Sequence, residues 1–202
     1  MASDDELSPA TVLSTRLPPL SVPEDEVASA LADRLACMVE SAVDVLGVDG
    51  VGLMLLDHDD ALRTAGFTNP PASALERVQA EIGEGPGIDA SEREETVAVA
   101  DLAEAPGYAG LWRRIAATGV RAVLASPVRV WGSVVGNLNA VRHRAHRWTE
   151  MEIRANEAYA RVIGVTLDLA VQTVDSGRSH HPEPGLRSDL TKPGNSAPDS
   201  GR

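Results

Sequence analysis

The sequence is poor in aromatic residues, has a single cysteine, and contains no apolar run long enough to cross a membrane. Aromatic side chains make up 3% of the 202 residues. A transmembrane helix needs about 20 consecutive apolar residues, so the lack of such a run predicts that the protein is not inserted in a membrane. The first residues, MASDDELSP, are acidic, whereas a secretory signal begins with positive charge. We therefore expect a cytoplasmic protein.

The single cysteine, Cys37, rules out an internal disulfide and a four-cysteine zinc site. It falls within a strongly patterned helical segment, where a free cysteine is usually a small core residue, so we expect it to be buried. No serine nucleophile motif stands out, and His143-x-x-His146 alone is a weak signal for a metal. The sequence therefore predicts no catalytic residue and no metal site.

Positive charge is scarce relative to negative charge, since the formal net charge is -12. Such a chain repels phosphate backbones, which argues against binding to nucleic acid. The only basic run in the expected folded region is formed by Arg142, Arg144 and Arg147. A solvated loop explains this run better than a binding patch does.

The two ends of the chain lack the residues that form a core. Residues 1–21 and 175–202 are rich in Ser, Pro and charged residues, and they cannot bury enough apolar area to offset the entropy of ordering. We expect a flexible N-terminal arm and a disordered C-terminal tail. The apolar content of 43% is normal for a globular core, so residues 22–174 are predicted to form one domain.

Two long amphipathic helices are expected at the ends of this domain. The first begins at a capping box formed by Ser21 and Glu24, and the last begins at a second one formed by Thr149 and Glu152. Each carries an apolar stripe at steps of three and four residues, which predicts a buried face. The stripes comprise Val27, Leu31, Leu35, Met38, Ala42 and Val45 in the first helix, and Ala155, Ala158, Val162, Val165 and Leu169 in the last.

Short apolar segments separated by turns predict strands between these helices. Two hairpins are expected, one from 51–57 with 61–68 and one from 121–130 with 134–143. Residues 95–102 form a further expected strand. Pro127 predicts that its strand lies at an edge or contains a bulge.

Shorter helices are predicted over 72–82 and 109–118, and the glycine-rich segment 83–87 is predicted to be a loop. The hairpins make the sheet mainly antiparallel, which places the domain in the α+β class. The economical packing puts both long helices on one face of the sheet. The short helices and loops then cover the other face.

Two motifs resemble the GAF family of sensory domains. The first is GEGPGIDA (83–90) followed by ETVAVADLAE (95–104), which is similar to a stretch of actinobacterial members. The second is GVRAVLASPVRVWGSVVGNLNAVRHR (119–144), which is similar to a hairpin of the family. The resemblance covers residues 24–173 and implies a PAS-like fold, a pocket between the sheet and its covering loops, and a homodimer through the terminal helices.

The chain resembles the sensory half of GAF-ANTAR proteins, but the residues after 173 do not resemble the RNA-binding ANTAR domain, so RNA binding is not expected. Family ligands are diverse and include cyclic nucleotides, haem, bilins and amino acids. Haem needs an axial ligand, usually histidine, and no histidine falls in the covering segment 69–120. Bilin attachment and thiol reductase chemistry need suitably placed cysteines, which Cys37 on the first helix does not provide. Neither haem nor bilin is therefore expected, and the cofactor is left open.

The remaining sequence motifs give only weak evidence for nucleotide binding or catalysis. Gly83, Gly85 and Gly87 follow a helix, whereas a dinucleotide-binding fingerprint follows a strand. The acidic residues between Asp89 and Glu95 are better explained by a solvated loop than by acid–base catalysis. We therefore expect that the protein is not an enzyme.

Five side chains are candidates for lining the pocket because aromatics offer stacking area while Ser and Asn supply orienting hydrogen bonds. They are Phe67, Tyr108, Trp112, Ser126 and Asn139. Ordinary core filling is the competing interpretation for Phe67 and Trp112. The sequence thus predicts a regulatory domain that senses an unidentified small molecule. The alternative is a ligand-free module that dimerises or docks a partner through its terminal helices.

Overall fold

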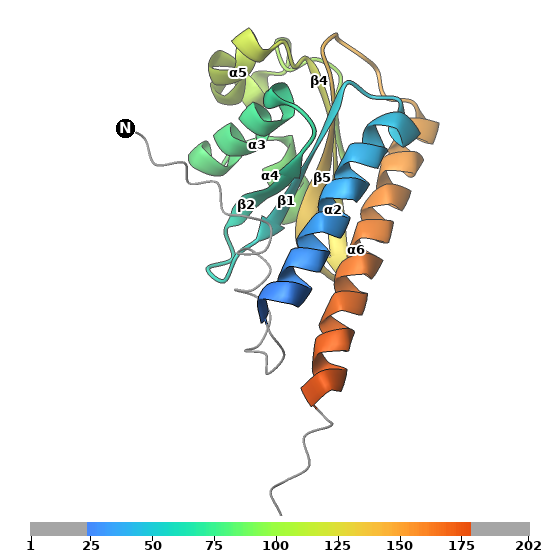
Figure 1. Ribbon diagram of the computed structural model, residues 1–202. Helices are drawn as coiled ribbons and strands as arrows, with labels where there is room; N and C mark the ends of the chain where they lie inside the picture. The colour runs from blue at the N-terminus through green and yellow to red at the C-terminus, as the bar shows by residue number, and fades with distance from the viewer. Residues whose placement is uncertain (1–23, 179–202) are drawn as a thin grey trace, which may run out of the picture.

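The computed structural model describes residues 24–178, whose helices and strands are shown in Figure 1. At the centre is a sheet with the strand order β2-β1-β5-β4-β3. All neighbouring strands are antiparallel, which confirms the predicted α+β class. The strands are β1 (Gly50–Leu56), β2 (Leu62–Phe67), β3 (Val97–Val99), β4 (Ala122–Val130) and β5 (Ser133–Arg142). The predicted arm, most of the predicted tail and Ser21 of the first capping box lie outside the described residues.

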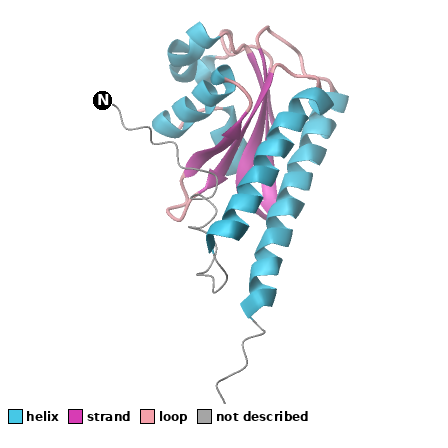
Figure 2. Ribbon diagram, viewed as in Figure 1, coloured by secondary structure: helices cyan, strands magenta, loops and turns pink. Residues whose placement is uncertain are grey.

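Helices cover both faces of the sheet (Figure 2). On one face, α2 (Glu24–Leu46) and α6 (Glu150–Arg178) pack beside each other, and we call this the long-helix face. On the other, the short-helix face, lie α3 (Pro70–Ile82), α4 (Pro86–Arg93) and α5 (Ala109–Ile115). This is the predicted arrangement. Among the described residues, no helix is both long and apolar enough to span a membrane.

The alternation of side chains along each strand divides the core into two apolar clusters. On the long-helix face, Leu53 of β1 and Leu138 of β5 pack with Ile163 of α6. On the short-helix face, Val123 and Val141 belong to a second cluster with residues of α3 and α5. Each face of the sheet is therefore buried, and polar side chains on either face need partners inside the protein.

The local strand environment explains Pro127. Strand β3 pairs only with residues 123–125 of β4. Pro127 lies beyond this pairing, so β4 behaves there as an edge toward β3, and a bulge follows between Val128 and Arg129. A residue without an N–H group is tolerated at such a position, as the sequence predicts.

The start of α6 is the predicted capping box. The hydroxyl of Thr149 accepts a hydrogen bond from the Glu152 N–H at 3.2 Å, and the Glu152 carboxylate accepts one from the Thr149 N–H at 2.7 Å. These bonds satisfy two backbone donors that have no partner within the helix. The helix runs to Arg178, beyond the predicted end near Thr173.

The predicted buried face of α6 is wrong. Ala160 and Ile163 are fully buried, whereas Val162, Val165 and Leu169 of the predicted stripe are 54%, 58% and 57% exposed. This helix is apolar on two sides, and spacing alone does not decide which side meets the sheet. The predicted stripe therefore forms an outer apolar surface.

A smaller correction applies to α2. Leu31 and Leu35 are buried as predicted, but the buried side continues through Val39, while Val45 is 67% exposed. Cys37 is exposed instead of being a core residue. Two positions before Val39, it is rotated away from the sheet, because successive helical residues are separated by about 100°.

The glycine-rich segment is not one continuous loop. Gly83 has a left-handed backbone conformation, with φ 66°, and ends α3. Three residues later α4 begins at Pro86, and proline is well suited to the first helical position because it needs no N–H partner there. The acidic residue Asp89 therefore lies on a helix and not in a solvated loop. Its carboxylate accepts a hydrogen bond from the Tyr108 hydroxyl.

Candidate functional site

A fully buried polar cluster lies between the sheet and α3. It consists of Glu76 and Gln79 of α3 and Asn137 and Asn139 of β5, all 0% exposed. Burying polar groups is costly unless they are hydrogen-bonded. Four such side chains together, in a domain whose core is otherwise mostly apolar, mark this layer as the candidate site.

Helix and strand geometry place these side chains together. Glu76 and Gln79 are three residues apart, so they share one face of α3. Asn137 and Asn139 are two residues apart, so they share one face of β5, opposite to Leu138 between them. The start of α3 is fixed by Asn69, whose side-chain oxygen accepts a hydrogen bond from the Ala72 N–H. The site is thus held by regular elements and not by a loop.

Hydrogen bonds join the strand to the helix. The side-chain amide of Asn139 donates to Glu76 Oε2 and to Asn137 Oδ1, both at 2.8 Å. Gln79 Nε2 donates to the same Glu76 oxygen at 3.3 Å and contacts the Met54 sulfur at 4.0 Å. The carboxyl group of Glu76 is therefore the centre of the cluster.

Helix α4 closes over the cluster through Gly87. The Gly87 N–H donates to Gln79 Oε1 at 2.7 Å, and its carbonyl accepts from Asn137 Nδ2 at 2.9 Å. Asn137 Nδ2 also donates to the Ser91 hydroxyl at 2.9 Å. The position of α4 on the sheet therefore depends directly on the cluster.

The close packing requires glycine at two positions. A Cβ atom at Gly52 of β1 would lie 2.0 Å from Glu76 Oε1, and one at Gly87 would lie 2.7 Å from Asn137 Oδ1. Neither contact is sterically possible without movement of the side chain. Glycine at these positions makes room for the buried polar groups.

The carboxyl group of Glu76 has an unusual protonation equilibrium. Burial disfavours its charged form and raises its pKa to about 8, although the hydrogen bonds from Asn139 and Gln79 act in the opposite direction. Glu76 Oε1 and Asn139 Oδ1 are buried and have no hydrogen bond partner among the described residues. At neutral pH the carboxyl group is mostly protonated, and because Oε2 already accepts two hydrogen bonds, the proton lies on Oε1. Loss of this proton leaves two buried acceptor atoms, Glu76 Oε1 and Asn139 Oδ1, without a donor.

A cleft of about 570 Å³ opens beside the cluster. Its walls come from the β1–β2 turn, the β4–β5 turn and the link between α3 and α4, and they include Arg63, Gly83 and Ser133. Ser91 also lines the cleft, and its hydroxyl accepts a hydrogen bond from Asn137. Ser91 therefore connects the open cleft to the buried cluster.

The five sequence-predicted pocket residues do not form one site. Asn139 belongs to the cluster. Ser126 lies on the long-helix face, where its hydroxyl accepts hydrogen bonds from Thr96 and Asn156. Phe67 lies at the end of the edge strand β2 and is 39% exposed. The strand alternation that buries Asn139 on one face directs Ser126 to the other.

The other two aromatic candidates lie in α5 or just before it. Tyr108 and Trp112 pack against the apolar cluster of the short-helix face, and Arg121 stacks over the Trp112 ring at 5.6 Å from its centroid.

Sequence reasoning missed Glu76, Gln79 and Asn137. The available signal was the presence of two polar residues in α3 beside the apolar face formed by Leu75 and Val78.

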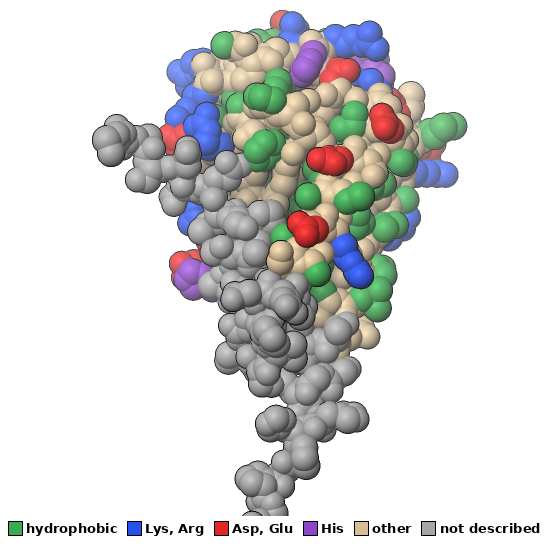
Figure 3. All heavy atoms as spheres, in the orientation of Figure 1, with side chains coloured by type: hydrophobic (Ala, Val, Ile, Leu, Met, Phe, Trp, Pro, Cys, Tyr) green, Lys and Arg blue, Asp and Glu red, His purple; other side chains and the backbone are tan. Residues whose placement is uncertain are grey.

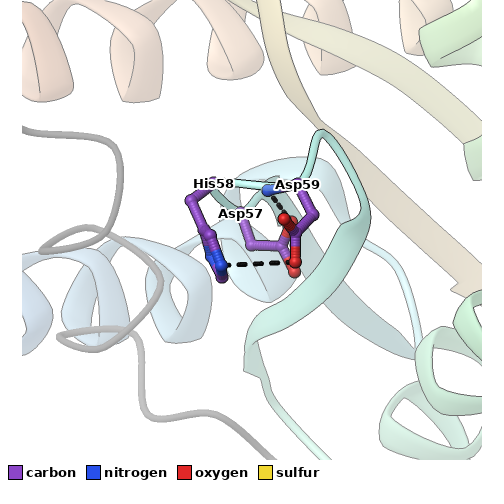
Figure 4. Close-up of side chains that lie close together, drawn as sticks. All are labelled: Asp57, His58 and Asp59. Carbon is purple, nitrogen blue, oxygen red and sulfur yellow. Dashed lines mark hydrogen bonds and ion pairs between the residues drawn. The ribbon is translucent and has the colours of Figure 1, made fainter.

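Asp57, His58 and Asp59 also lie close together (Figure 4). The carboxylate of Asp57 accepts hydrogen bonds from the N–H groups of Asp59 and Ala61 at 2.9 and 3.0 Å. Its other oxygen accepts from Arg63 Nε at 2.9 Å. These contacts stabilise the β1–β2 turn, so we assign this group a structural role.

The basic run is not wholly a solvated loop. Arg142 is the last residue of β5, its side chain is 12% exposed, and it pairs with Glu152 at 3.0 Å. His146 pairs with the same carboxylate at 2.8 Å. Burial by itself raises the pKa of Glu152. The hydrogen bonds from Thr149, His146 and Arg142 outweigh this effect and lower the pKa to about 2. This group fixes the entry into α6.

The antiparallel sheet, the paired terminal helices and the buried polar layer under the short helices define a small α+β domain. The family model of the GAF domain matches residues 30–167, and the chain belongs to the GAF domain family. Members of this family are signalling and sensory regulatory domains. A search of the curated proteins gives no match.

Solved structures with the same fold come from several kinds of protein. The GAF3 domain of Slr1393 from Synechocystis is 20% identical with a TM-score of 0.58, over 75% of this chain and 99% of that one. A domain of a putative two-component sensor histidine kinase from Sinorhizobium meliloti is 18% identical with a TM-score of 0.56, and the match covers 74% of this chain and 97% of that one. Free methionine-R-sulfoxide reductase from Neisseria meningitidis is 20% identical with a TM-score of 0.57, and the match covers 86% of this chain and 96% of that one. At these identities the likeness concerns the fold.

Proposed function

We propose that the chain is a cytoplasmic regulatory GAF domain that senses a small molecule between the sheet and helices α3 and α4. The observation that carries this proposal is the buried cluster around Glu76, which contains two acceptor atoms without a partner. An unsatisfied buried polar group costs about 1–3 kcal/mol. A ligand that supplied the missing donors would recover this cost on binding.

The same cluster offers a way to report binding. Both polar backbone groups of Gly87 are bonded to cluster side chains, so a ligand that changes these bonds would shift α4. On the other face, Asn156 of α6 donates to the Leu138 carbonyl at 3.4 Å. Leu138 lies between Asn137 and Asn139, so β5 contacts both the site and the long terminal helix.

We favour sensing over catalysis because of where the reactive groups lie. The single cysteine of the sequence, Cys37, is on α2 on the long-helix face, so the sheet separates it from the cluster. A thiol-based reaction at the cluster would need a cysteine on the short-helix face. The fold is shared with reductases, but fold alone does not determine chemistry.

A thermal-shift screen tests the sensing proposal. Purified protein is incubated with cyclic nucleotides, amino acids, amines and other metabolites, and the expected result is a ligand that raises Tm. Asn139→Leu should abolish that shift, whereas Asn69→Asp, which keeps the helix cap outside the cluster, should retain it. If no compound raises Tm, or if Asn139→Leu binds as well as the parent, the proposal is wrong.

Dimerisation is a second candidate function, favoured by the outer surface of α6. Exposed apolar residues run along α6 at alternating steps, and Figure 3 shows hydrophobic side chains along this side of the molecule. Met151, Val162, Val165 and Leu169 are each more than half exposed. With Ala155 and Ala158 they follow a 4-3-4-3-4 spacing, which is typical of a helix that packs against another helix. We propose a homodimer through this surface.

A further inference from the structure

The hydrogen bonds of the cluster determine which kind of ligand it can accept. Gly87 fixes the orientation of two side-chain amides, because its N–H can only donate and its carbonyl can only accept. Gln79 must therefore turn its oxygen toward the Gly87 N–H, and Asn137 must turn its nitrogen toward the Gly87 carbonyl. This leaves the nitrogen of Gln79 facing Glu76 and the oxygen of Asn137 facing Asn139.

With these orientations, every amide hydrogen of the cluster is already used. Asn139 donates to Glu76 and Asn137, and Asn137 donates to Gly87 and Ser91. Gln79 donates to Glu76 and contacts the Met54 sulfur. Each side-chain amide has two donor hydrogens, so none is left for a ligand.

When Glu76 is ionised, the atoms that remain available are acceptors. Glu76 Oε1 and Asn139 Oδ1 are both buried without a donor. The groups bonded to Glu76 are amides, and no Arg or Lys of the described residues forms an ion pair with it. With Glu76 ionised, the site therefore has neither the donors nor the positive charge that an anion would need, and its carboxylate has no counter-charge.

We propose that the ligand of this site carries a small cationic N–H group, an ammonium or guanidinium, which binds at Glu76 and Asn139. This inference rests on the proposed sensing function and names the class of ligand for it. The cationic group donates to Glu76 Oε1 and Asn139 Oδ1 and supplies the missing positive charge. Anionic ligands, cyclic nucleotides among them, are disfavoured because the cluster has no positive charge and its amide hydrogens are all used, which leaves only the O–H of protonated Glu76 as a donor.

The ligand reaches the cluster from the cleft at the ends of the hairpins. Ser91 lines this cleft and is bonded to Asn137. Glu92 and Glu94 line it as well, and negative charge at the opening favours the approach of a cation.

Binding of a cation also releases a proton. The acid form of Glu76 loses its proton to solvent, and the carboxylate then pairs with the cationic group of the ligand. Because the free carboxyl has a pKa of about 8, it is about 90% protonated at pH 7. Each bound cation should therefore release up to about 0.9 proton at that pH.

Calorimetry and thermal shift with defined probes test this inference. The cationic probes are putrescine, agmatine and histamine, the neutral probe is 1,4-butanediol, and the anionic probes are cyclic AMP and cyclic GMP. We expect at least one cation to bind with proton release, measured from the difference in heat between two buffers of unequal ionisation enthalpy. Glu76→Gln should weaken binding at least tenfold and remove the proton release. Glu81→Gln, an exposed carboxylate on the same helix, should bind as the parent does.

The outcomes separate this inference from the sensing function. Binding of an anionic or neutral compound that is blocked by Asn139→Leu, with no binding of cations, would overturn the ligand class but keep the sensing function. Cation binding that is unchanged in Glu76→Gln would also overturn the ligand class. If neither the probes nor the wider metabolite panel binds, both proposals are wrong.

Discussion

The side-chain amide of Asn139 donates a 2.8 Å hydrogen bond to the Glu76 carboxyl group, and this bond joins the central strand β5 to helix α3 inside the protein. Gly87 of α4 and Gly52 of β1 pack closely against the cluster around it. Three predictions follow from the energetic cost of this arrangement and from the outer surface of α6.

The stability of the protein should fall as pH rises from about 4.5 to about 8. The pKa of Glu76 is raised from 4.5 to about 8 by burial, so within this window the folded state binds a proton that the unfolded state releases. The free energy of unfolding then decreases by up to about 1.4 kcal/mol per pH unit. Below this window Glu76 is protonated in both the folded and the unfolded state. Above it Glu76 is ionised in both states, so it no longer changes the free energy of unfolding with pH.

Glu76→Gln should remove this part of the pH dependence, because the amide is neutral at every pH. Urea unfolding between pH 5 and pH 9 measures it, and the variant should be more stable than the parent at pH 9. Glu81→Gln serves as the control, since this carboxylate is exposed. Parallel stability curves for the parent and Glu76→Gln would show that Glu76 is not held as a buried acid.

Gly52→Ala should destabilise the protein through a clash with Glu76. The added Cβ would lie 2.0 Å from Glu76 Oε1, and overpacking of this kind costs about 1–3 kcal/mol. The cost should be much smaller in a Glu76→Ala background, because the clashing atom is gone. A double-mutant cycle of unfolding free energies measures the coupling, and strictly additive effects would contradict the close contact.

Gly66→Ala is the matched control for this cycle. Gly66 lies on the neighbouring strand β2, and a Cβ there would make only ordinary contacts, 3.5 Å or more from Val39. Its effect should be the same with and without Glu76.

The outer surface of α6 should hold two copies of the chain together. Light scattering is expected to give the mass of a dimer, and Val162→Glu or Leu169→Glu should convert it to a monomer, because each places a charge within an apolar contact. Arg161→Glu is a suitable control, since this exposed residue lies outside the stripe. A monomer at all concentrations, or a dimer that both glutamate variants leave unchanged, would count against this surface.

Much of the fold could be predicted because its signals are local. The hairpin turns, the Thr149 capping box and the strand alternation each depend on residues a few positions apart. The unpredicted helix α4 shows the limit of such signals. Its eight residues are too few for a stable isolated helix, so it forms through the contacts that Gly87 makes with the cluster.

The candidate site was harder to predict than the fold. Asn139 and Ser126 are both predicted as pocket residues from their strands, but the two residues lie on opposite faces of the sheet. Glu76 and Gln79 are ordinary residues for a solvent-exposed helix, and only the packing of α3 on the sheet shows that they are buried.

The sequence by itself determined the order of the elements, the antiparallel hairpins and the two long helices, because period and turn chemistry act over short distances. The tertiary structure alone decided which stripe of α6 is buried, that Cys37 is exposed, and that the Glu76 carboxyl group is hydrogen-bonded to two buried amides. These outcomes depend on how α3 and α6 are rotated against the sheet. That rotation is set by contacts between residues far apart in the chain.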